Sequence, residues 1–191
     1  MKPLTETPDH KKAKDIFTDG LRLLGYRTHQ EFDFLLVGLF GYQVKTVWRG
    51  LQDLKILRGS RYISKDKDIA TYPHSIDIFA ERVTTHGLKE KVAIEIDGEI
   101  HKDEDQQKRD RLFEAMWDLW VEAPQERFRV WKHHILKMPP ELTLSFVQFV
   151  LRGKYTELCN QYTDHDIDMQ VLISKVLNEA RRHPARKEQI N

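Results

Sequence analysis

The sequence contains one cysteine, carries a net charge of only +1 and has no long apolar run. Cys159 therefore cannot close an internal disulfide, and without a CxxC pair a structural zinc site is not expected. No apolar run reaches the roughly 18 residues that span a bilayer, and the polar start MKPLTETPDH shows no signal-peptide pattern. We expect an intracellular (cytoplasmic) protein with no membrane partner, in which Cys159 is simply packed.

The sequence also has no large excess of either charge, because its 31 Lys and Arg residues are balanced by 30 Asp and Glu residues. The composition therefore gives no global basic signal for nucleic acid, and any such contact must be local. Charged residues make up 32% of the 191 residues and apolar residues 40%, a balance far from that of disordered chains. The chain is long enough to bury a core, so we expect one compact unit.

Several catalytic and metal-binding motifs are absent. There is no GxSxG or HExxH, and RGKYT lacks the glycine-rich approach of a phosphate-binding loop. Asp164, Asp166 and Asp168 alternate like calcium-loop ligands, but Met169 and Lys175 stand where glycine and glutamate are required. Acids at a helix N-terminus explain the three aspartates better.

Two apolar stretches carry acids, 75–83 (SIDIFAERV) and 91–100 (KVAIEIDGEI). Successive side chains of a strand point to opposite faces, so Glu95 and Asp97 share one face, roughly 7 Å apart. A turn between the stretches predicts an antiparallel hairpin, in which Asp77 can converge with Glu95 and Asp97. Such a cluster needs a hard cation to neutralise it. The alternative is that the acids form a solvated sheet face.

The acids and the residues that follow them form a short signature: Asp77, Glu95, Ile96, Asp97, Gly98 and His101. It resembles the PD-(D/E)XK nuclease superfamily, especially small members with an E-x-D-G-x-x-H signature akin to very short patch repair endonucleases. The resemblance covers roughly residues 43–132. It implies a restriction-endonuclease-like α/β fold, a central mixed sheet flanked by helices, and a DNA endonuclease in which Asp77 and Glu95 bind metal. The family usually has lysine at the position of Asp97.

Phosphodiester cleavage requires neutralisation of the phosphoryl group and activation of water, and carboxylates that hold Mg²⁺ (or Mn²⁺ in its place) achieve both. We therefore predict a Mg²⁺-dependent deoxyribonuclease that acts in DNA repair, recombination or restriction. Asp77 and Glu95 would be its metal ligands. Asp97 would bind metal or orient the attacking water, and His101 would be auxiliary or only mark a turn. A homodimer is compatible with cutting both strands. The alternatives are a non-catalytic nuclease-fold module that binds nucleic acid or protein, and a winged helix-turn-helix over 34–64.

Basic residues near these elements are candidates for contact with the DNA backbone: Lys45, Arg49, Lys102, Lys108 and Arg111. The first two lie on the polar face of a helix predicted over 44–54, and the other three lie near the start of a helix predicted over 103–120. For each of them the alternative is a solvated surface position.

Periodicity predicts further elements. Helices are expected over 9–24, 141–152 and 166–182, and strands over 26–33, 61–64 and 127–135, with 34–40 undecided. Adjacent His133 and His134 would point to opposite sides of the last strand. The segments expected are a helical extension (1–42), a nuclease-like core (43–135), C-terminal helices (136–182) and a flexible tail (183–191).

Overall fold

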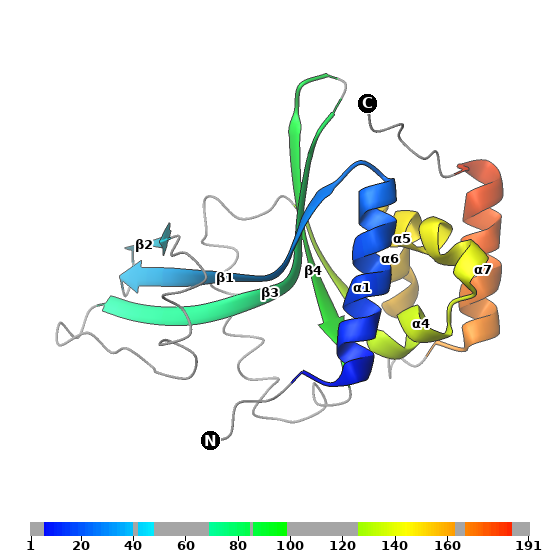
Figure 1. The fold of residues 1–191 in the computed structure, drawn as a ribbon, viewed down its shortest axis with the longest axis horizontal. Helices are drawn as coiled ribbons and strands as arrows, with labels where there is room; N and C mark the ends of the chain where they lie inside the picture. The colour runs from blue at the N-terminus through cyan, green and yellow to red at the C-terminus, as the bar shows by residue number, and fades with distance from the viewer. Residues whose placement is uncertain are drawn as a thin grey trace. The chain divides into compact units, whose positions relative to one another are not determined.

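The computed structural model describes residues 6–39, 42–47, 69–84, 86–98, 126–162 and 167–184. It has a mixed α/β architecture in which helices flank a mixed sheet, as the sequence predicts (Figure 1). The helices are α1 (Pro8–Leu23), α4 (Lys132–Lys137), the 3₁₀ helix η2 (Pro140–Leu142), α5 (Thr143–Leu151), α6 (Lys154–Cys159) and α7 (Met169–Arg182). The strands are β1 (Arg27–Leu39), β2 (Tyr42–Val47), β3 (Ile69–Val83), β4 (Lys89–Asp97) and β5 (Glu126–Trp131).

The strands of the described residues are hydrogen-bonded in the order β2-β1-β3-β4-β5. The chain divides into two compact units. The first consists of Met1–Thr5, Glu31–Ile76 and Glu99–Pro124, and the second of Glu6–Gln30, Asp77–Gly98 and Gln125–Asn191. The second unit therefore joins α1 to the β3–β4 hairpin, β5 and all the C-terminal helices, and the candidate site lies within it.

Helix α1 begins and ends within one residue of the predicted bounds. The Thr7 hydroxyl accepts the His10 N–H at 3.2 Å as an N-cap, and Gly25 follows the helix with φ 82°, a conformation that favours glycine. Along the helix, Gly20 faces α5 so closely that a Cβ there would lie 2.6 Å from Val147 Cγ2. Glycine therefore allows α1 to pack directly on α5.

The hairpin of β3 and β4 is antiparallel, which confirms the predicted pairing. Its register runs from Val83↔Lys89 to Ile78↔Ile94, and Gly87 in the turn has φ 75°. The apolar side chains of these strands and of β5 pack against α1, α5 and α7 in one core: Phe17, Leu21, Ile78, Ala80, Val92, Ile94, Ile96, Phe128, Val130, Phe146, Val147, Val150, Leu172 and Val176. Burial of each large member stabilises the fold by about 1.5–3 kcal/mol, so this face fixes the strands that carry the acids.

The helix predicted over 44–54 is wrong at its start, because Tyr42–Val47 forms β2. This strand pairs antiparallel with β1, with Val37 opposite Lys45. The segment YQVKTV is rich in β-branched residues, which favour strands, and this local preference outweighs the apolar spacing that indicated a helix. The undecided run 34–40 belongs to β1 as far as Leu39. A helix-turn-helix over 34–64 would need a helix where β2 stands, so that alternative is wrong as well.

The strand predicted over 127–135 is correct only as far as Trp131, since Lys132–Lys137 forms α4. His133 and His134 are therefore neighbours on a helix and not on opposite sides of a strand. The alternation of apolar and polar residues breaks at Lys132, which is where the strand ends. The six-residue α6 was missed, because a helix of this length carries too few turns to show periodicity.

Helices α5 and α7 confirm the last two predicted helices. Asp168 caps α7 by accepting the N–H groups of Gln170 and Val171, which agrees with reading that aspartate as a helix N-terminal acid. No helix among the described residues is long and apolar enough to cross a membrane. The strand predicted over 61–64 and the helix predicted over 103–120 lie outside the described residues.

Candidate functional site

Asp77 lies at the point where the β3–β4 ladder stops. The last registered pair is Ile78↔Ile94, and continuing that register by one residue would place Asp77 opposite Glu95. Instead, the Asp77 side chain crosses the end of the ladder, and its Oδ2 accepts the backbone N–H of Ile96 at 2.7 Å. A carboxylate held by a backbone donor has a fixed direction, so Asp77 is oriented by the strand that carries the other two acids.

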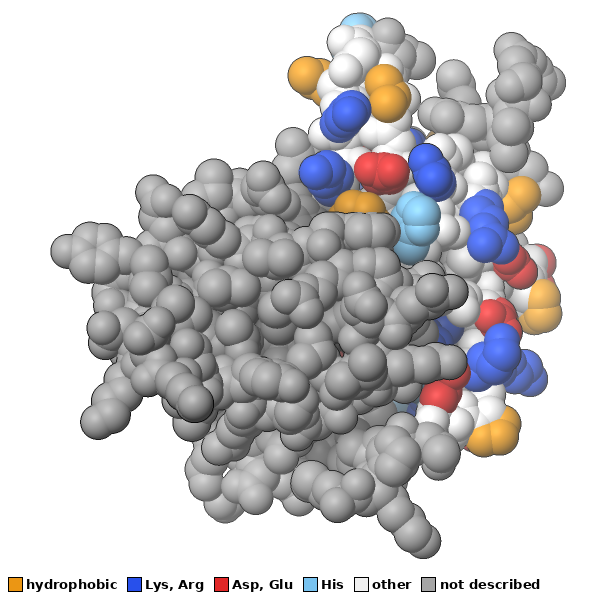
Figure 2. Space-filling model, turned by 60° about the vertical axis from the view of Figure 1, so that its left-hand side comes forward, with side chains coloured by type: hydrophobic (Ala, Val, Ile, Leu, Met, Phe, Trp, Pro, Cys, Tyr) orange, Lys and Arg blue, Asp and Glu red, His pale blue; other side chains and the backbone are white. Residues whose placement is uncertain are grey.

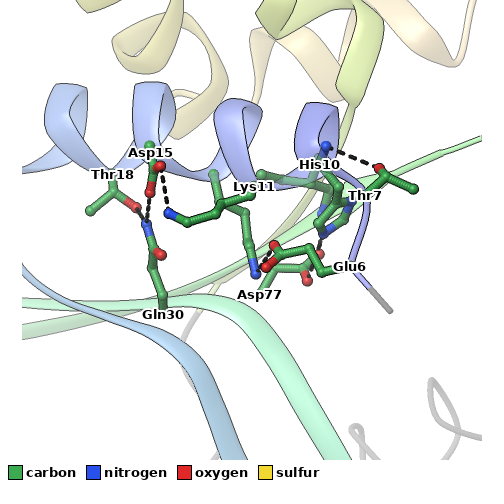
Figure 3. A network of polar contacts seen from close by, with 10 residues as sticks. Glu6, Thr7, His10, Lys11, Asp15, Thr18, Gln30 and Asp77 are labelled. Atoms are coloured by element: carbon green, nitrogen blue, oxygen red, sulfur yellow. Dashed lines mark hydrogen bonds and ion pairs between the residues drawn. The ribbon is translucent and has the colours of Figure 1, made fainter. Parts of the chain in front are cut away.

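Helix α1 supplies the second contact of Asp77. His10 Nε2 lies 3.1 Å from Asp77 Oδ1, and the two side chains are 23% and 20% exposed (Figure 3). The helix cap formed by Thr7 fixes the turn from which His10 extends. Asp77 is thus held by a strand on one oxygen and by a helix on the other, while water can still reach it.

Strand β5 brings two arginines to the acids of β4. Parallel pairing places Ala93 beside Arg127 and Glu95 beside Arg129, so the arginines share the acidic face of the sheet. Each guanidinium reaches the acid two residues further along β4. Arg127 Nε lies 4.0 Å from Glu95 Oε1, whereas Arg129 binds both oxygens of Asp97, at 2.9 Å through Nε and 3.0 Å through a terminal nitrogen.

These six side chains form what we call the charged cluster: His10, Asp77, Glu95, Asp97, Arg127 and Arg129. Its members differ in how firmly they are paired. Asp97 is 8% exposed and engages one guanidinium with both oxygens, whereas Glu95 is 13% exposed and its contact with Arg127 is at the long limit of an ion pair. Among the described residues no group of three or more His, Cys, Asp or Glu side chains is placed to hold a metal ion.

Sequence reasoning missed a buried lysine close to this cluster. Lys14 lies one turn after His10 on α1, is 1% exposed and forms an ion pair with Glu6. The sequence did contain a signal for this burial, because Lys14 lies at the same helical spacing as Phe17 and Leu21, on the apolar face of the helix. A lysine on such a face is costly unless it is paired. Arg127 and Arg129 were also passed over, although they alternate with buried Phe128 and Val130.

The remaining predicted site residues are not brought to the cluster by the described structure. Five of them lie outside the described residues: His101, Arg49, Lys102, Lys108 and Arg111. For Lys45 the structure gives its position on β2 but not its side chain. On the face of the molecule seen in Figure 2, basic and acidic side chains of the described residues are interspersed.

A second polar cluster, which we call the neutral cluster, lies beyond the end of β5 and consists of Trp131 N–H, His134, Tyr155 and Ile167 C=O. His134 Nδ1 lies 2.7 Å from the Tyr155 hydroxyl and Nε2 lies 3.3 Å from the Ile167 carbonyl, which can only accept. His134 Nε2 therefore carries a proton, and in the neutral ring Nδ1 then accepts the Tyr155 O–H. The Tyr155 oxygen in turn accepts Trp131 N–H at 3.1 Å. Burial raises the pKa of the Tyr155 hydroxyl well above its usual value.

Comparisons with known proteins give no match for this chain. No protein-family model matches it, and neither a curated protein nor a solved structure does so. The function must therefore be argued from the geometry of the charged cluster.

Proposed function

We propose that this protein is a Mg²⁺-dependent endonuclease that hydrolyses phosphodiester bonds in DNA, with a restriction-endonuclease-like core of PD-(D/E)XK type. The observation that carries the proposal is the placement of Asp77 and Glu95 on adjacent strands where their ladder ends. The Asp77 carboxylate is held by the backbone of β4, the strand of Glu95, and the Asp77 and Glu95 side chains are 20% and 13% exposed. On the opposite face of β4, the apolar side chains Val92, Ile94 and Ile96 are buried in the core.

The donor set suits a hard divalent cation. Mg²⁺ prefers carboxylate oxygens and keeps several of its waters, so two acids are sufficient protein ligands. Asp77 forms an ion pair with His10, which is charged only when protonated, and Glu95 Oε1 lies 4.0 Å from Arg127 Nε. Asp77 and Glu95 would hold the ion. When bound, the ion would neutralise charge on the phosphoryl group and activate water for attack.

Asp97 fits the metal role less well than Asp77 and Glu95. Both of its oxygens contact Arg129, and a carboxylate that binds a guanidinium in this way has little capacity left for a cation. Asp77 and Glu95 are therefore the proposed metal ligands, and Asp97 is not.

The test is incubation of the purified chain with labelled duplex, nicked, branched and single-stranded DNA, in Mg²⁺, in Mn²⁺ and in EDTA. We expect cleavage of at least one substrate with either metal and none in EDTA. Calorimetric titration with Mn²⁺ should show one class of site, and Asp77→Asn should weaken it. Absence of cleavage under all conditions, together with absence of metal binding, would rule the proposal out.

A non-catalytic nuclease-fold module is the second candidate. It is favoured by the pairing of all three acids with a histidine or an arginine, since ion pairs alone would account for acids in this position. DNA binding without cleavage or metal uptake in the same assays would support this module over the enzyme.

A further inference from the structure

The pairing of β4 with β5 repeats one pattern twice. Glu95 and Asp97 alternate on β4, Arg127 and Arg129 alternate on β5, and each arginine reaches the acid two residues beyond its own register partner. Parallel strands end at the same edge of a sheet, so the pair of Asp97 and Arg129 lies at the carboxyl ends of both strands. This edge adjoins the residues of the proposed metal site.

The two members of that outer pair are not equally buried. Asp97 is 8% exposed, whereas Arg129 is 33% exposed. Asp97 accepts hydrogen bonds from Nε and from one terminal nitrogen along one edge of the planar Arg129 guanidinium. The acid therefore fixes the plane of the guanidinium from the buried side, while part of the cation faces water.

A second cation lies at the same edge. Lys132 follows β5 directly, and its Nζ lies 3.9 Å from where a Cβ on Gly98 would stand. The ammonium is therefore close to the residue that follows Asp97 at the end of β4. Arg129 and Lys132 bring two positive charges to this end of the strands, where the resemblance would place a single lysine at position 97.

We propose that Arg129, with Lys132 beside it, binds a backbone phosphate of the nucleic acid, and that Asp97 is a positioning residue that holds the Arg129 guanidinium in place for it. This inference rests on the proposed function, because it assumes a phosphodiester substrate at Asp77 and Glu95. A guanidinium fixed by a bidentate carboxylate loses less freedom when it binds phosphate, and its fork matches two phosphate oxygens. Asp97 thus acts through Arg129 and not through the metal.

The direction in which Asp97→Asn changes DNA affinity separates this positioning role from simple charge repulsion. Removing an acid near a phosphate strengthens binding if the acid only repels the DNA. If Asp97 positions Arg129, then Asp97→Asn weakens binding instead. The variant Asp97→Asn with Arg129→Gln should then bind no worse than Arg129→Gln alone, because the two residues act through one contact.

Binding is measured by fluorescence anisotropy with a labelled duplex in EDTA, over a series of salt concentrations, so that no cleavage is required. We expect Arg129→Gln to weaken binding about tenfold and to lower the slope of affinity against salt by about one. Arg129→Lys keeps the charge but not the fork, and should recover only part of the loss. The matched control is Arg82→Gln, which removes the same charge from a 29% exposed arginine paired with Glu90 elsewhere on the hairpin, and should change affinity less than about twofold.

The possible outcomes separate this inference from the proposed function. If the wild type binds DNA while Arg129→Gln binds equally well at every salt concentration, the inference is overturned and the nuclease proposal stands. Asp97→Asn that binds DNA more tightly, or that raises the Mg²⁺ requirement of cleavage while Arg129→Gln does not, also overturns it. A wild type that neither binds nor cleaves DNA removes the proposed function itself. Thermal melts of each variant exclude unfolding as the cause.

Discussion

The charged cluster and the neutral cluster both satisfy polar groups at the end of β5, but they do so in opposite ways. In the neutral cluster His134 and Tyr155 are fully buried and each contact joins one donor to one acceptor. In the charged cluster the groups carry charge, and several of them can reach water. A neutral network that is closed to water can only hold its elements together, whereas charged groups open to water can exchange partners with an ion or a phosphate. Under the proposed function, the neutral cluster therefore serves the structure and the charged cluster serves the chemistry.

The largest difference between the two clusters should appear in catalysis. Asp77→Asn keeps an oxygen that accepts the Ile96 N–H and removes the charge, so we expect the cleavage rate to fall by about 1,000-fold or more while the melting temperature changes little. The measurement is single-turnover cleavage at saturating Mg²⁺. Glu81→Gln, four residues along the same strand, is the control and should cleave at nearly the wild-type rate. Full activity of Asp77→Asn would remove that residue from the site.

The next effect concerns stability and should come from the neutral cluster. Tyr155→Phe leaves Trp131 N–H and His134 Nδ1 without the hydroxyl that satisfies them, and we expect a loss of about 1–3 kcal/mol in the free energy of unfolding. Urea denaturation measures this loss. The cleavage rate per folded molecule should remain that of the wild type. A variant as stable as the wild type would show that the network does not hold α4 and α6 to β5.

A smaller effect should report how well the neutral cluster is closed to solvent. Cys159 is buried beside Tyr155, and burial raises the pKa of its thiol. Thiolate is the reactive form, so the native thiol should react with a disulfide reagent at pH 8 much more slowly than the thiol in the urea-unfolded chain. Equal rates in both states would indicate that this region opens readily.

The smallest effect should come from an ion pair that belongs to neither cluster. A hydrogen bond from Arg82 lowers the pKa of Glu90, and burial opposes this shift. The pair therefore contributes stability above the ordinary carboxyl pKa of 4.5, and this contribution is lost as the pH falls through the lowered pKa of the folded state. Because the Glu90 side chain is 36% exposed, we expect Glu90→Gln to cost less than about 1 kcal/mol at pH 7. Its difference from the wild type should shrink below pH 4 in chemical denaturation.

The sequence predicted the position of the acids because that prediction rests on local rules. A period of two places Glu95 and Asp97 on one face, and a glycine turn returns the chain so that β3 pairs with β4. The arginine partners could not be predicted in this way. They depend on the parallel register of β5 against β4, which is set by packing of the core and brings Arg129 to Asp97, 32 positions away in the sequence.

Local rules also failed where two patterns competed. The apolar residues of 44–54 fit a helical spacing, yet residues 42–47 form the strand β2, which pairs with β1. His133 and His134 looked like members of a strand because the alternation before them was regular, but the strand ends at Trp131. In both places tertiary context decided between elements that the local sequence allowed.

The hydrogen bond from Ile96 to Asp77 turns an ordinary backbone amide into a spectroscopic reporter. The nitrogen and proton of Ile96 sense the carboxylate directly, although the two residues are 19 positions apart in the sequence. Any ion or proton that engages Asp77 must change the electron density on that oxygen, and hence the resonance of a single buried amide. Occupancy of the site can therefore be followed by nuclear magnetic resonance with no DNA present and no bond being cut.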